Sequence, residues 1–312
     1  MAVGDCVAIV TGASSGIGLR TAAALYDKGY TVVLACRNER KTRQCIERDI
    51  LRAAGASSPR LIYMHVDLED LSTVRAFAKK FSSQFSNLHI LVNNAGLAGN
   101  KESITVDGYE LLFQVNFLSH VLLTELLWPM LVKSAPSRVV HVSSVIHRLG
   151  ATNFFVRATR FSLTQSYGTS KLAQILYTYH CQRTRTERDG VTSITLNPGP
   201  VNSDIWRSFL FEPLRSLFKT LASVVFLNTD QGASTSIAAA TDPLYENSGD
   251  LIYLTPFQKF WFLPSWTQDI YGRYAGAVQV PSSVASYNIQ TGEDLVRLAF
   301  DLLDLKPATT YG

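Results

Sequence analysis

The chain has 312 residues, of which 46% are hydrophobic, a share normal for a globular protein and too high for a disordered one. Lysine and arginine number 29 against 25 aspartates and glutamates, and no dense basic run occurs, so we expect no nucleic-acid partner. The four cysteines and six histidines are scattered without C-x-x-C or H-E-x-x-H spacing, which predicts free thiols in a reducing compartment and no metal site.

The N-terminus leads directly into an apolar run. Residues 1–10 contain Asp5 and lack the positive segment of a signal peptide, so we expect an intracellular protein, either cytoplasmic or peripherally membrane-associated. The longest apolar region, Phe117–Val132, is interrupted by polar residues and a proline. It predicts a buried helix and no transmembrane helix.

Short apolar runs alternate with longer amphipathic stretches over the first 200 residues. The runs are Val7–Val10, Thr31–Ala35, Leu61–Val66, His89–Val92, Arg138–Val142 and Val191–Leu196, and the stretches include Ile17–Lys28, Glu39–Ala53 and Leu71–Phe85. Strand-length runs that alternate with helix-length segments predict an α/β fold with a parallel sheet covered on both faces. Right-handed crossovers make that sheet doubly wound, the Rossmann fold.

The pattern loosens after the sixth run. The elements expected there are a long connection over residues 200–228, a helix over Asp230–Ala240, a short strand at Leu251–Tyr253 and a helix near Glu293–Leu303. No linker divides the chain before this part. We therefore expect a single domain, residues 1–253, that binds a dinucleotide and carries the catalytic residues. Residues 254–312 form an aromatic-rich C-terminal extension that packs on the same domain.

A glycine-rich turn joins the first strand to the first helix. A sharp turn and a close approach of a pyrophosphate to the backbone both need residues without a Cβ, and the helix N-terminus offers free N–H groups to the phosphates. This placement predicts a dinucleotide site rather than an ordinary tight turn. The residues expected to line it are Gly12, Ser14, Ser15, Gly16, Ile17 and Gly18.

The second strand ends at Cys36 and is followed by Arg37 and Asn38, close to the spacing expected for the ribose-binding residue. A carboxylate there would repel a 2′-phosphate, whereas the planar guanidinium of Arg37 suits a phosphate and stacks on adenine. NADP(H) is therefore the expected cofactor. A solvated surface arginine is the alternative.

Seven motifs together resemble the short-chain dehydrogenase/reductase family. They are the Gly12/Gly16/Gly18 spacing, Asp67 after the third strand, Asn93-Asn94-Ala95-Gly96 after the fourth, Asn116 in the next helix, Ser144 after the fifth strand, Tyr167-Gly168-Thr169-Ser170-Lys171, and Asn197-Pro198-Gly199 after the sixth. The resemblance spans residues 3–253 and implies an oxidoreductase that interconverts a carbonyl and an alcohol. Within the family, Ala35-Cys36-Arg37-Asn38 and His141-Val142-Ser143-Ser144 resemble the retinol dehydrogenase-like branch.

Proton transfer in such a reaction is expected of Tyr167. Hydride transfer to a carbonyl leaves an alkoxide that needs a proton, and a free tyrosine with a pKa of about 10 is a poor base at neutral pH. Lys171 follows one helical turn later on the same face, and its charge would lower the pKa of the tyrosine. We therefore expect Tyr167 as acid/base and Lys171 as its electrostatic partner. By resemblance, Lys171 also holds the nicotinamide ribose.

Ser144 and Asn116 complete the expected catalytic set. Ser144 follows the C-terminal end of a strand, where open α/β sheets bind ligands, and would hydrogen-bond the substrate oxygen. It is favoured over Ser143 because the family uses the second serine of such a pair. By the same resemblance, Asn116 would hold a water that links Lys171 to solvent, and a helix-packing amide is the alternative.

The resemblance also implies the remaining cofactor contacts. Asp67 would contact the adenine amino group, Asn94 to Gly96 would line the ribose, and Pro198 with Gly199 would flank the carboxamide. The full expected set outside the glycine loop is Arg37, Asn38, Asp67, Leu68, Asn94, Ala95, Gly96, Tyr167, Lys171, Pro198, Gly199 and Val201. Ser15 departs from the family pattern because many NADP(H)-preferring members carry a basic residue there. Arg37 would then supply most of the selectivity.

Three apolar segments predict a lipophilic substrate. Phe154, Phe155 and Phe161 lengthen the spacing between Ser144 and Tyr167. Ile205–Val225 carries apolar residues at helical spacing, and residues 257–266 are rich in aromatics. The last two segments either pack on the core or form a lid that touches a membrane surface. The expected substrate is a small lipophilic carbonyl or alcohol of retinoid, steroid or fatty aldehyde type, and the sequence leaves a homo-oligomer open.

Two other functions are compatible with such a fold, because fold does not fix function. A non-catalytic dinucleotide-binding sensor or scaffold tends to lose the tyrosine or the lysine, and here all four catalytic positions are filled. An extended-type epimerase or dehydratase has a different glycine spacing and a larger C-terminal domain. We therefore favour the oxidoreductase.

Overall fold

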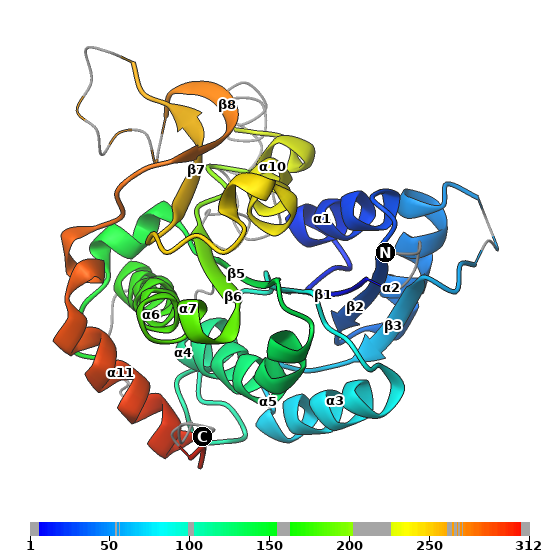
Figure 1. Ribbon diagram of the computed structural model, residues 1–312, viewed down its shortest axis with the longest axis horizontal. Helices are drawn as coiled ribbons and strands as arrows, with labels where there is room; N and C mark the ends of the chain where they lie inside the picture. Colours follow the sequence, from blue (N-terminus) through cyan, green and yellow to red (C-terminus); the bar gives the residue numbers. More distant parts are fainter. Residues whose placement is uncertain are drawn as a thin grey trace.

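Eight strands form one sheet in the order β3-β2-β1-β4-β5-β6-β7-β8 (Figure 1). The structure, a computed structural model, describes residues 6–306 except 54, 56, 99–102, 155–162, 202–225, 261–263, 265, 266, 268 and 270. The strands β1 to β7 pair in parallel, and β8 pairs antiparallel with β7. The order from β3 to β6 is that of the doubly wound Rossmann sheet, so the predicted fold is confirmed.

The first six strands lie where the apolar runs predict them. They are β1 Val7–Thr11, β2 Thr31–Cys36, β3 Leu61–His65, β4 Ile90–Asn93, β5 Ser137–Val142 and β6 Val191–Leu196. Every residue of β1, β2, β4, β5 and β6 is buried. Burial of both faces explains why these strands are continuous apolar runs rather than alternating ones.

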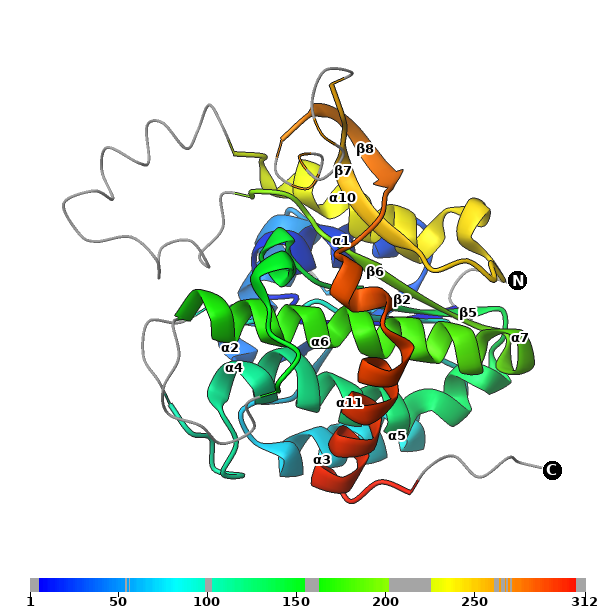
Figure 2. The same cartoon turned by 90° about the vertical axis from the view of Figure 1, so that its left-hand side faces the viewer.

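Helices cover both faces of the sheet (Figures 1 and 2). One face carries α1 Gly16–Asp27 and α10 Thr229–Thr241, and the other carries α3 Leu71–Gln84, α5 Ser119–Lys133 and α6 Leu163–Thr184, with α11 Ile289–Leu302 packed against α6. Shorter helical pieces are α2 Glu39–Cys45, α4 Leu111–Phe113, α7 Thr186–Asp189, the π-helical turns Ile46–Ile50 and Gln114–Leu118, and the 3-10 turns Val145–Leu149, Pro243–Tyr245 and Val284–Tyr287.

The two largest apolar clusters of the core lie one on each side of the sheet. Val7 and Ile9 of β1 belong to the cluster beneath α3, α5 and α6, whereas Ala8 and Val10 belong to the cluster beneath α1 and α10. Successive side chains of a strand point to opposite faces, so each strand contributes to both clusters. The sheet is therefore fixed from both sides, and its carboxyl edge provides a rigid base for the site.

One helical stretch, Leu111–Lys133, is long and apolar enough to cross a membrane by length and composition alone. In this fold, 72% of its apolar window is buried inside the protein. Leu122, Leu123 and Leu127 have no exposed surface. The stretch thus forms part of the core, where the helix over Phe117–Val132 was expected.

The end of the sheet differs from the prediction. The last strand was expected at Leu251–Tyr253, but β7 spans Tyr253–Gln258, and a further strand, β8, spans Arg273–Gln279. The pairing of β7 with β8 shifts register between Thr255 and Phe257, on either side of Pro256, which has no N–H to donate. The apolar pattern could not indicate β8, because its residues are exposed or half-buried.

Several of the segments singled out from the sequence lie outside the described residues. They are Phe155, Phe161, Ile205–Val225, Trp261, Phe262 and Trp266. Of their neighbours, Phe154 stacks on Phe113 with ring centroids 6.4 Å apart, and Phe260 lies 5.8 Å from Tyr271. Phe257 is buried in β7.

Candidate active site

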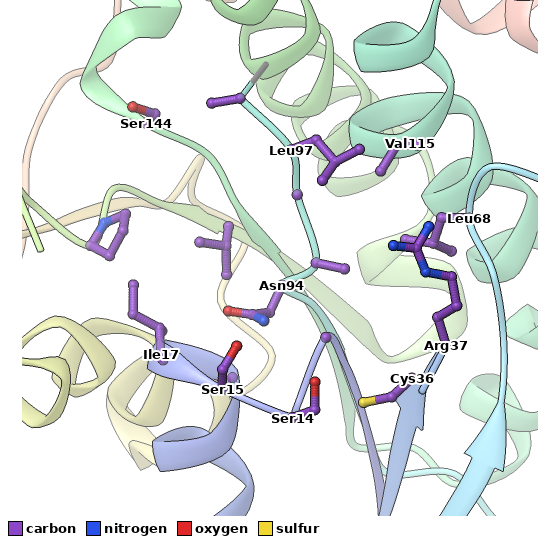
Figure 3. Close-up of a pocket in the computed structure, with 18 of the residues that line it drawn as sticks. Ser14, Ser15, Ile17, Cys36, Arg37, Leu68, Asn94, Leu97, Val115 and Ser144 are labelled. Carbon is purple, nitrogen blue, oxygen red and sulfur yellow. The ribbon is translucent and has the colours of Figure 1, made fainter. Parts of the chain in front are cut away.

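The carboxyl ends of the parallel strands open into one cavity of about 900 Å³. This is the edge at which doubly wound sheets bind ligands, and the volume suits a cofactor. Figure 3 shows Ser144 and Arg37 on opposite sides of it, with Asn94 between them. The predicted residues that line the cavity are Gly12, Ser14, Ser15, Gly16, Ile17, Gly18, Arg37, Asn38, Asp67, Leu68, Asn94, Ala95, Gly96, Ser144, Tyr167, Lys171, Pro198, Gly199 and Val201.

The glycine loop leaves room for a phosphate group. Gly16 begins α1 and lines the cavity, and a Cβ built on it would meet no protein atom within 4 Å. A Cβ on Gly18 would instead lie 2.7 Å from the carbonyl oxygen of Gly12 and would clash with the side-chain amide of Asn94. There is therefore open space beside Gly16 at the N-terminus of α1, while Gly18 allows α1 to pack closely on the end of β1.

Asn94 is hydrogen-bonded to Thr11, the last residue of β1. Its side-chain amide donates to the carbonyl oxygen of Thr11 at 2.8 Å, and the backbone N–H groups of Asn94 and Ala95 both donate to the Thr11 hydroxyl at 2.9 Å. The same hydroxyl lies 3.1 Å from Nε2 of His120. Sequence reasoning missed Thr11 and His120, although Thr11 directly precedes Gly12. The loop after β4 thus has a structural function that is compatible with lining a ribose.

Asn116 is the one predicted residue that does not line the cavity. It sits in a π-helical turn, Gln114–Leu118, and its side chain is fully hydrogen-bonded. Oδ1 accepts from the backbone N–H of Leu97 at 2.8 Å, and Nδ2 donates to the carbonyl oxygen of Leu97 and to Ser170 Oγ, both at 3.0 Å. This arrangement is the packing amide named above as the alternative, and it holds Leu97 in the cavity wall.

Tyr167 and Lys171 lie one turn apart on α6 and face the same cavity, as predicted. Ser144 lines the same cavity and is near enough to the Tyr167 hydroxyl to lower the pKa of that hydroxyl. The Lys171 Nζ lies 5.8 Å from the centre of the Tyr167 ring, and it donates to the carbonyl oxygen of Val142 at 2.8 Å and to Gln174 Oε1 at 3.0 Å. Sequence reasoning missed Gln174, which follows Lys171 on the same helix.

The two neighbouring serines are in different environments. The Ser143 hydroxyl is buried and donates to the carbonyl oxygen of Lys171 at 2.9 Å. The Ser144 hydroxyl accepts from the backbone N–H of Ile146 at 3.3 Å and faces Tyr167. Both serines line the cavity, but the Ser143 hydroxyl is bound to the backbone of α6, whereas the Ser144 hydroxyl lies near Tyr167.

Burial dominates the protonation of the tyrosine and the lysine. It raises the pKa of Tyr167 to about 12, against the opposing hydrogen bond from Ser144, and lowers the pKa of Lys171 to about 7. The direction for Tyr167 is the reverse of the predicted lowering. The reason is desolvation, which disfavours the tyrosinate and also the charged form of Lys171, whose ammonium donates to neutral oxygens rather than to a carboxylate.

The Arg37 side of the cavity contains carboxylates. The Nη1 atom of Arg37 lies 2.6 Å from Glu69 Oε1 and 3.7 Å from Asp67 Oδ2. The Arg37 side chain remains 61% exposed, so its ion pairs can open at low cost. Lys41 and Glu69 also line this end. Sequence reasoning missed both, although Glu69 follows the predicted Asp67-Leu68 pair and Lys41 lies one turn after Asn38.

The opposite end, around Tyr167, has an apolar wall. Tyr167 belongs to an apolar cluster with Ala98 and Leu112, and Leu97 and Ile146 pack against it. Leu97, Ala98 and Ile146 line the cavity. The cavity is therefore charged where Arg37 lies and apolar where the tyrosine hydroxyl lies.

The sequence and the fold are similar to those of one known protein family. The family model of the short-chain dehydrogenases matches residues 6–211, a range that contains every predicted site residue. Mouse retinol dehydrogenase 12 is 39% identical over 259 residues, covering 82% of this chain and 79% of its own. Mouse retinol dehydrogenase 11 is 42% identical over 248 residues, covering 78% and 76%. A crystal structure of an uncharacterized Mycobacterium paratuberculosis protein superposes with a TM-score of 0.72 at 28% identity, covering 96% of this chain and 94% of its own.

Proposed function

Because this chain belongs to the short-chain dehydrogenase family, and resembles its retinol dehydrogenases, we propose that it transfers a hydride between NADP(H) and a lipophilic carbonyl or alcohol, with Tyr167 moving the proton. The family's members are oxidoreductases of alcohols and carbonyls that bind a nicotinamide dinucleotide. The observation that carries the proposal is that Ser144, Tyr167 and Lys171 line one cavity together, at the end whose wall is apolar.

The residues present fit a dinucleotide. Gly16 leaves an open space at the N-terminus of α1, where backbone N–H groups and the helix dipole favour a pyrophosphate. Asn94, Ala95 and Gly96 would line the ribose, and Pro198 with Gly199 would flank the carboxamide. When bound, the nicotinamide supplies or accepts the hydride. Side chains of the protein would bind and orient the substrate oxygen and donate the proton.

Tyr167 is suited to donate a proton. With its pKa raised to about 12, the hydroxyl is protonated at neutral pH. In carbonyl reduction the Tyr167 O–H bond breaks, and the proton forms the O–H bond of the product alcohol. Ser144 would hydrogen-bond the same oxygen and orient it. The protonated fraction of Lys171 would stabilise the tyrosinate that remains. The contacts of Asn116 with Leu97 and Ser170 favour its packing role over the water-holding role that the resemblance implies.

NADP(H) remains our preferred cofactor, supported by two basic residues at the adenosine end. Arg37 and Lys41 both line the cavity after β2, where a 2′-phosphate would lie. Glu69 and Asp67 oppose this preference, because a phosphate must compete with them for Arg37. The outcome depends on charge, since a phosphate carries more negative charge than either carboxylate and the existing pairs are solvent-exposed.

The substrate we propose is a small lipophilic molecule. The two mouse relatives described above are retinol dehydrogenases, and Leu97, Ala98 and Ile146 give the Tyr167 end an apolar wall. Retinoid, steroid and fatty aldehyde carbonyls are the classes to screen. Peripheral membrane contact through residues 205–225 and 257–266 stays part of this proposal, although most of these residues are outside the described structure.

We also propose that residues 254–312 pack on the domain formed by residues 1–253. Three features support this organisation. β7 continues the sheet beside β6, β8 pairs with β7, and α11 packs against α6. Separate expression of residues 1–253 should then give an unstable protein, which circular dichroism and thermal melting would reveal.

A screen of NADPH oxidation with retinoid, steroid and fatty aldehyde carbonyls tests the function directly. Turnover of at least one lipophilic carbonyl, with NADPH preferred over NADH, is expected. A sensor or scaffold would bind the dinucleotide but turn over none of these compounds. Turnover of only small polar carbonyls would contradict the substrate class and leave the enzyme class intact.

A further inference from the structure

His147 lies between the loop that carries Ser144 and the chain that follows β8. It sits in the 3-10 turn Val145–Leu149 and is only 1% exposed. Its Nδ1 lies 2.7 Å from the backbone carbonyl oxygen of Ser144. Its Nε2 lies 3.0 Å from the backbone nitrogen of Ser283, 136 residues further along the chain.

These two partners allow only one form of the ring. A carbonyl oxygen can only accept, so Nδ1 carries the hydrogen and donates to Ser144. A backbone N–H can only donate, so Nε2 carries the lone pair and accepts from Ser283. His147 is therefore a neutral bridge of fixed tautomer. Burial, which lowers the pKa of His147 to about 4, keeps it neutral at physiological pH.

We propose that His147 is a positioning residue through which Ser283 fixes the Ser144 hydroxyl that faces Tyr167. The bridge ends on the backbone carbonyl of Ser144 itself, and the Ser144 hydroxyl accepts from the nearby backbone N–H of Ile146. This inference rests on the proposed role of Ser144 in binding the substrate oxygen. A displacement of Ser144 by a fraction of an ångström is enough to slow a reaction that depends on orientation.

A second set of bonds joins the same parts of the molecule. The Arg148 guanidinium pairs with the buried carboxylate of Asp269 and donates to the carbonyl oxygen of Pro281 at 3.0 Å. The side-chain amide of Asn197, at the end of β6, donates to the carbonyl oxygen of Asp269 at 2.7 Å. The loops after β5 and β6 are thus both attached to the chain that surrounds β8. Among the described residues, the ionisable neighbours of His147 are Arg148, which is paired with Asp269, and Tyr253, whose ring lies edge-on at 5.3 Å.

Ser283→Pro removes the donor to His147 with little other change. The φ of Ser283 is −68°, which is the value that proline adopts, and its buried hydroxyl has no hydrogen-bond partner to lose. Val284→Pro is the matched control, because Val284 is the exposed first residue of the next 3-10 turn, a position that tolerates proline. His147→Asn removes the bridge at the histidine, since the shorter amide can still donate to Ser144 but cannot reach Ser283.

The assay is steady-state reduction of all-trans-retinal by NADPH, together with the Kd for NADPH and the Tm of each variant. We expect Ser283→Pro and His147→Asn each to lower kcat about five- to tenfold, with the Kd for NADPH within twofold of the parent. The double variant should be no slower than the slower single variant, because both changes break one bridge. Val284→Pro should keep the parent kcat.

Ser144→Ala separates failure of the inference from failure of the proposed function. If Ser144→Ala keeps the parent kcat, the proposed role of Ser144 is wrong and the positioning role of His147 is wrong with it. If Ser144→Ala is slow but Ser283→Pro and His147→Asn keep the parent kcat, only the inference is overturned. It is also overturned if the two variants lose NADPH affinity and kcat together, because the bridge would then support the fold rather than Ser144.

Discussion

At this site, the protonation and the contacts of individual side chains depend on burial and on partners from distant parts of the chain. Tyr167, Lys171, Ser144 and the glycines could be predicted from the sequence, because each follows a strand end or lies one helical turn from another. Glu69 could not be predicted as a partner of Arg37, because that ion pair joins the ends of two different strands. The reversed direction of the pKa of Tyr167 also depends on burial, which only the folded structure provides.

Replacing Tyr167 with phenylalanine tests the proton transfer. Tyr167→Phe removes the hydroxyl and keeps the ring, so kcat should fall by about 10²- to 10⁴-fold while NADPH binds as before. Tyr177→Phe is the matched control, because Tyr177 is also buried on α6 but donates to Glu125 Oε1 at 2.6 Å and does not line the cavity. Steady-state kinetics and NADPH titration measure both. A variant that retains more than about a tenth of the parent kcat would mean that Tyr167 is not the acid/base.

Two charge changes at the adenosine end should move cofactor preference in opposite directions. Arg37→Asp replaces a phosphate partner with a carboxylate, so the ratio of NADPH to NADH affinity should fall at least about tenfold. Glu69→Gln removes the competitor of the phosphate for Arg37, so NADPH affinity should rise about two- to fivefold while NADH affinity stays constant. Titration of both cofactors against each variant measures the ratios. An unchanged ratio in Arg37→Asp would show that Arg37 is a surface charge.

At the scale of elements, the apolar runs were sufficient to predict β1 to β6, because buried parallel strands must be apolar on both faces. The same criterion was insufficient at the sheet edge. β8 is exposed or half-buried along its length, and β7 continues through Pro256 by a shift in register. The aromatic content near Phe257 was interpreted as a separate apolar segment, whereas the buried ring of Phe257 belongs to a strand.

Substitution of Gly18 tests whether the glycine loop allows α1 to pack closely on the end of β1. A Cβ at Gly18 would meet the carbonyl oxygen of Gly12 at 2.7 Å, and neither that backbone group nor the hydrogen-bonded Asn94 amide can move freely. Gly18→Ala should therefore lower the free energy of unfolding by about 1–3 kcal/mol and weaken NADPH binding. Gly249→Ala, where a Cβ meets nothing within 4 Å, is the control and should change stability by less than about 0.5 kcal/mol. Urea unfolding and NADPH titration give both quantities, and equal stability of the two variants would contradict the close packing.

Across the whole molecule, the buried charge of Lys171 should couple stability to pH. The pKa of Lys171 is about 7 in the folded protein and 10.5 as a free side chain, so between these values the unfolded chain binds the extra proton. The free energy of unfolding should therefore rise with pH across this window, by up to about 1.4 kcal/mol per pH unit. Below pH 7 the lysine is charged in both states, and its contribution no longer changes with pH.

Other buried groups titrate in the same region, so the measurement must be a difference between two proteins. Burial raises the pKa of Tyr167 to about 12 and also raises the pKa of Cys36, so above about pH 9 the unfolded chain loses protons that the folded protein keeps, and stability falls. Lys171→Met fills a similar volume without the charge and leaves Tyr167 and Cys36 in place. The stability of the parent minus that of Lys171→Met, from urea unfolding at pH 7, 8, 9 and 10, should increase at each step. A constant difference would mean that Lys171 keeps its ordinary pKa, and the neutral oxygens of Val142 and Gln174 would then be sufficient to hold its charge in the folded protein.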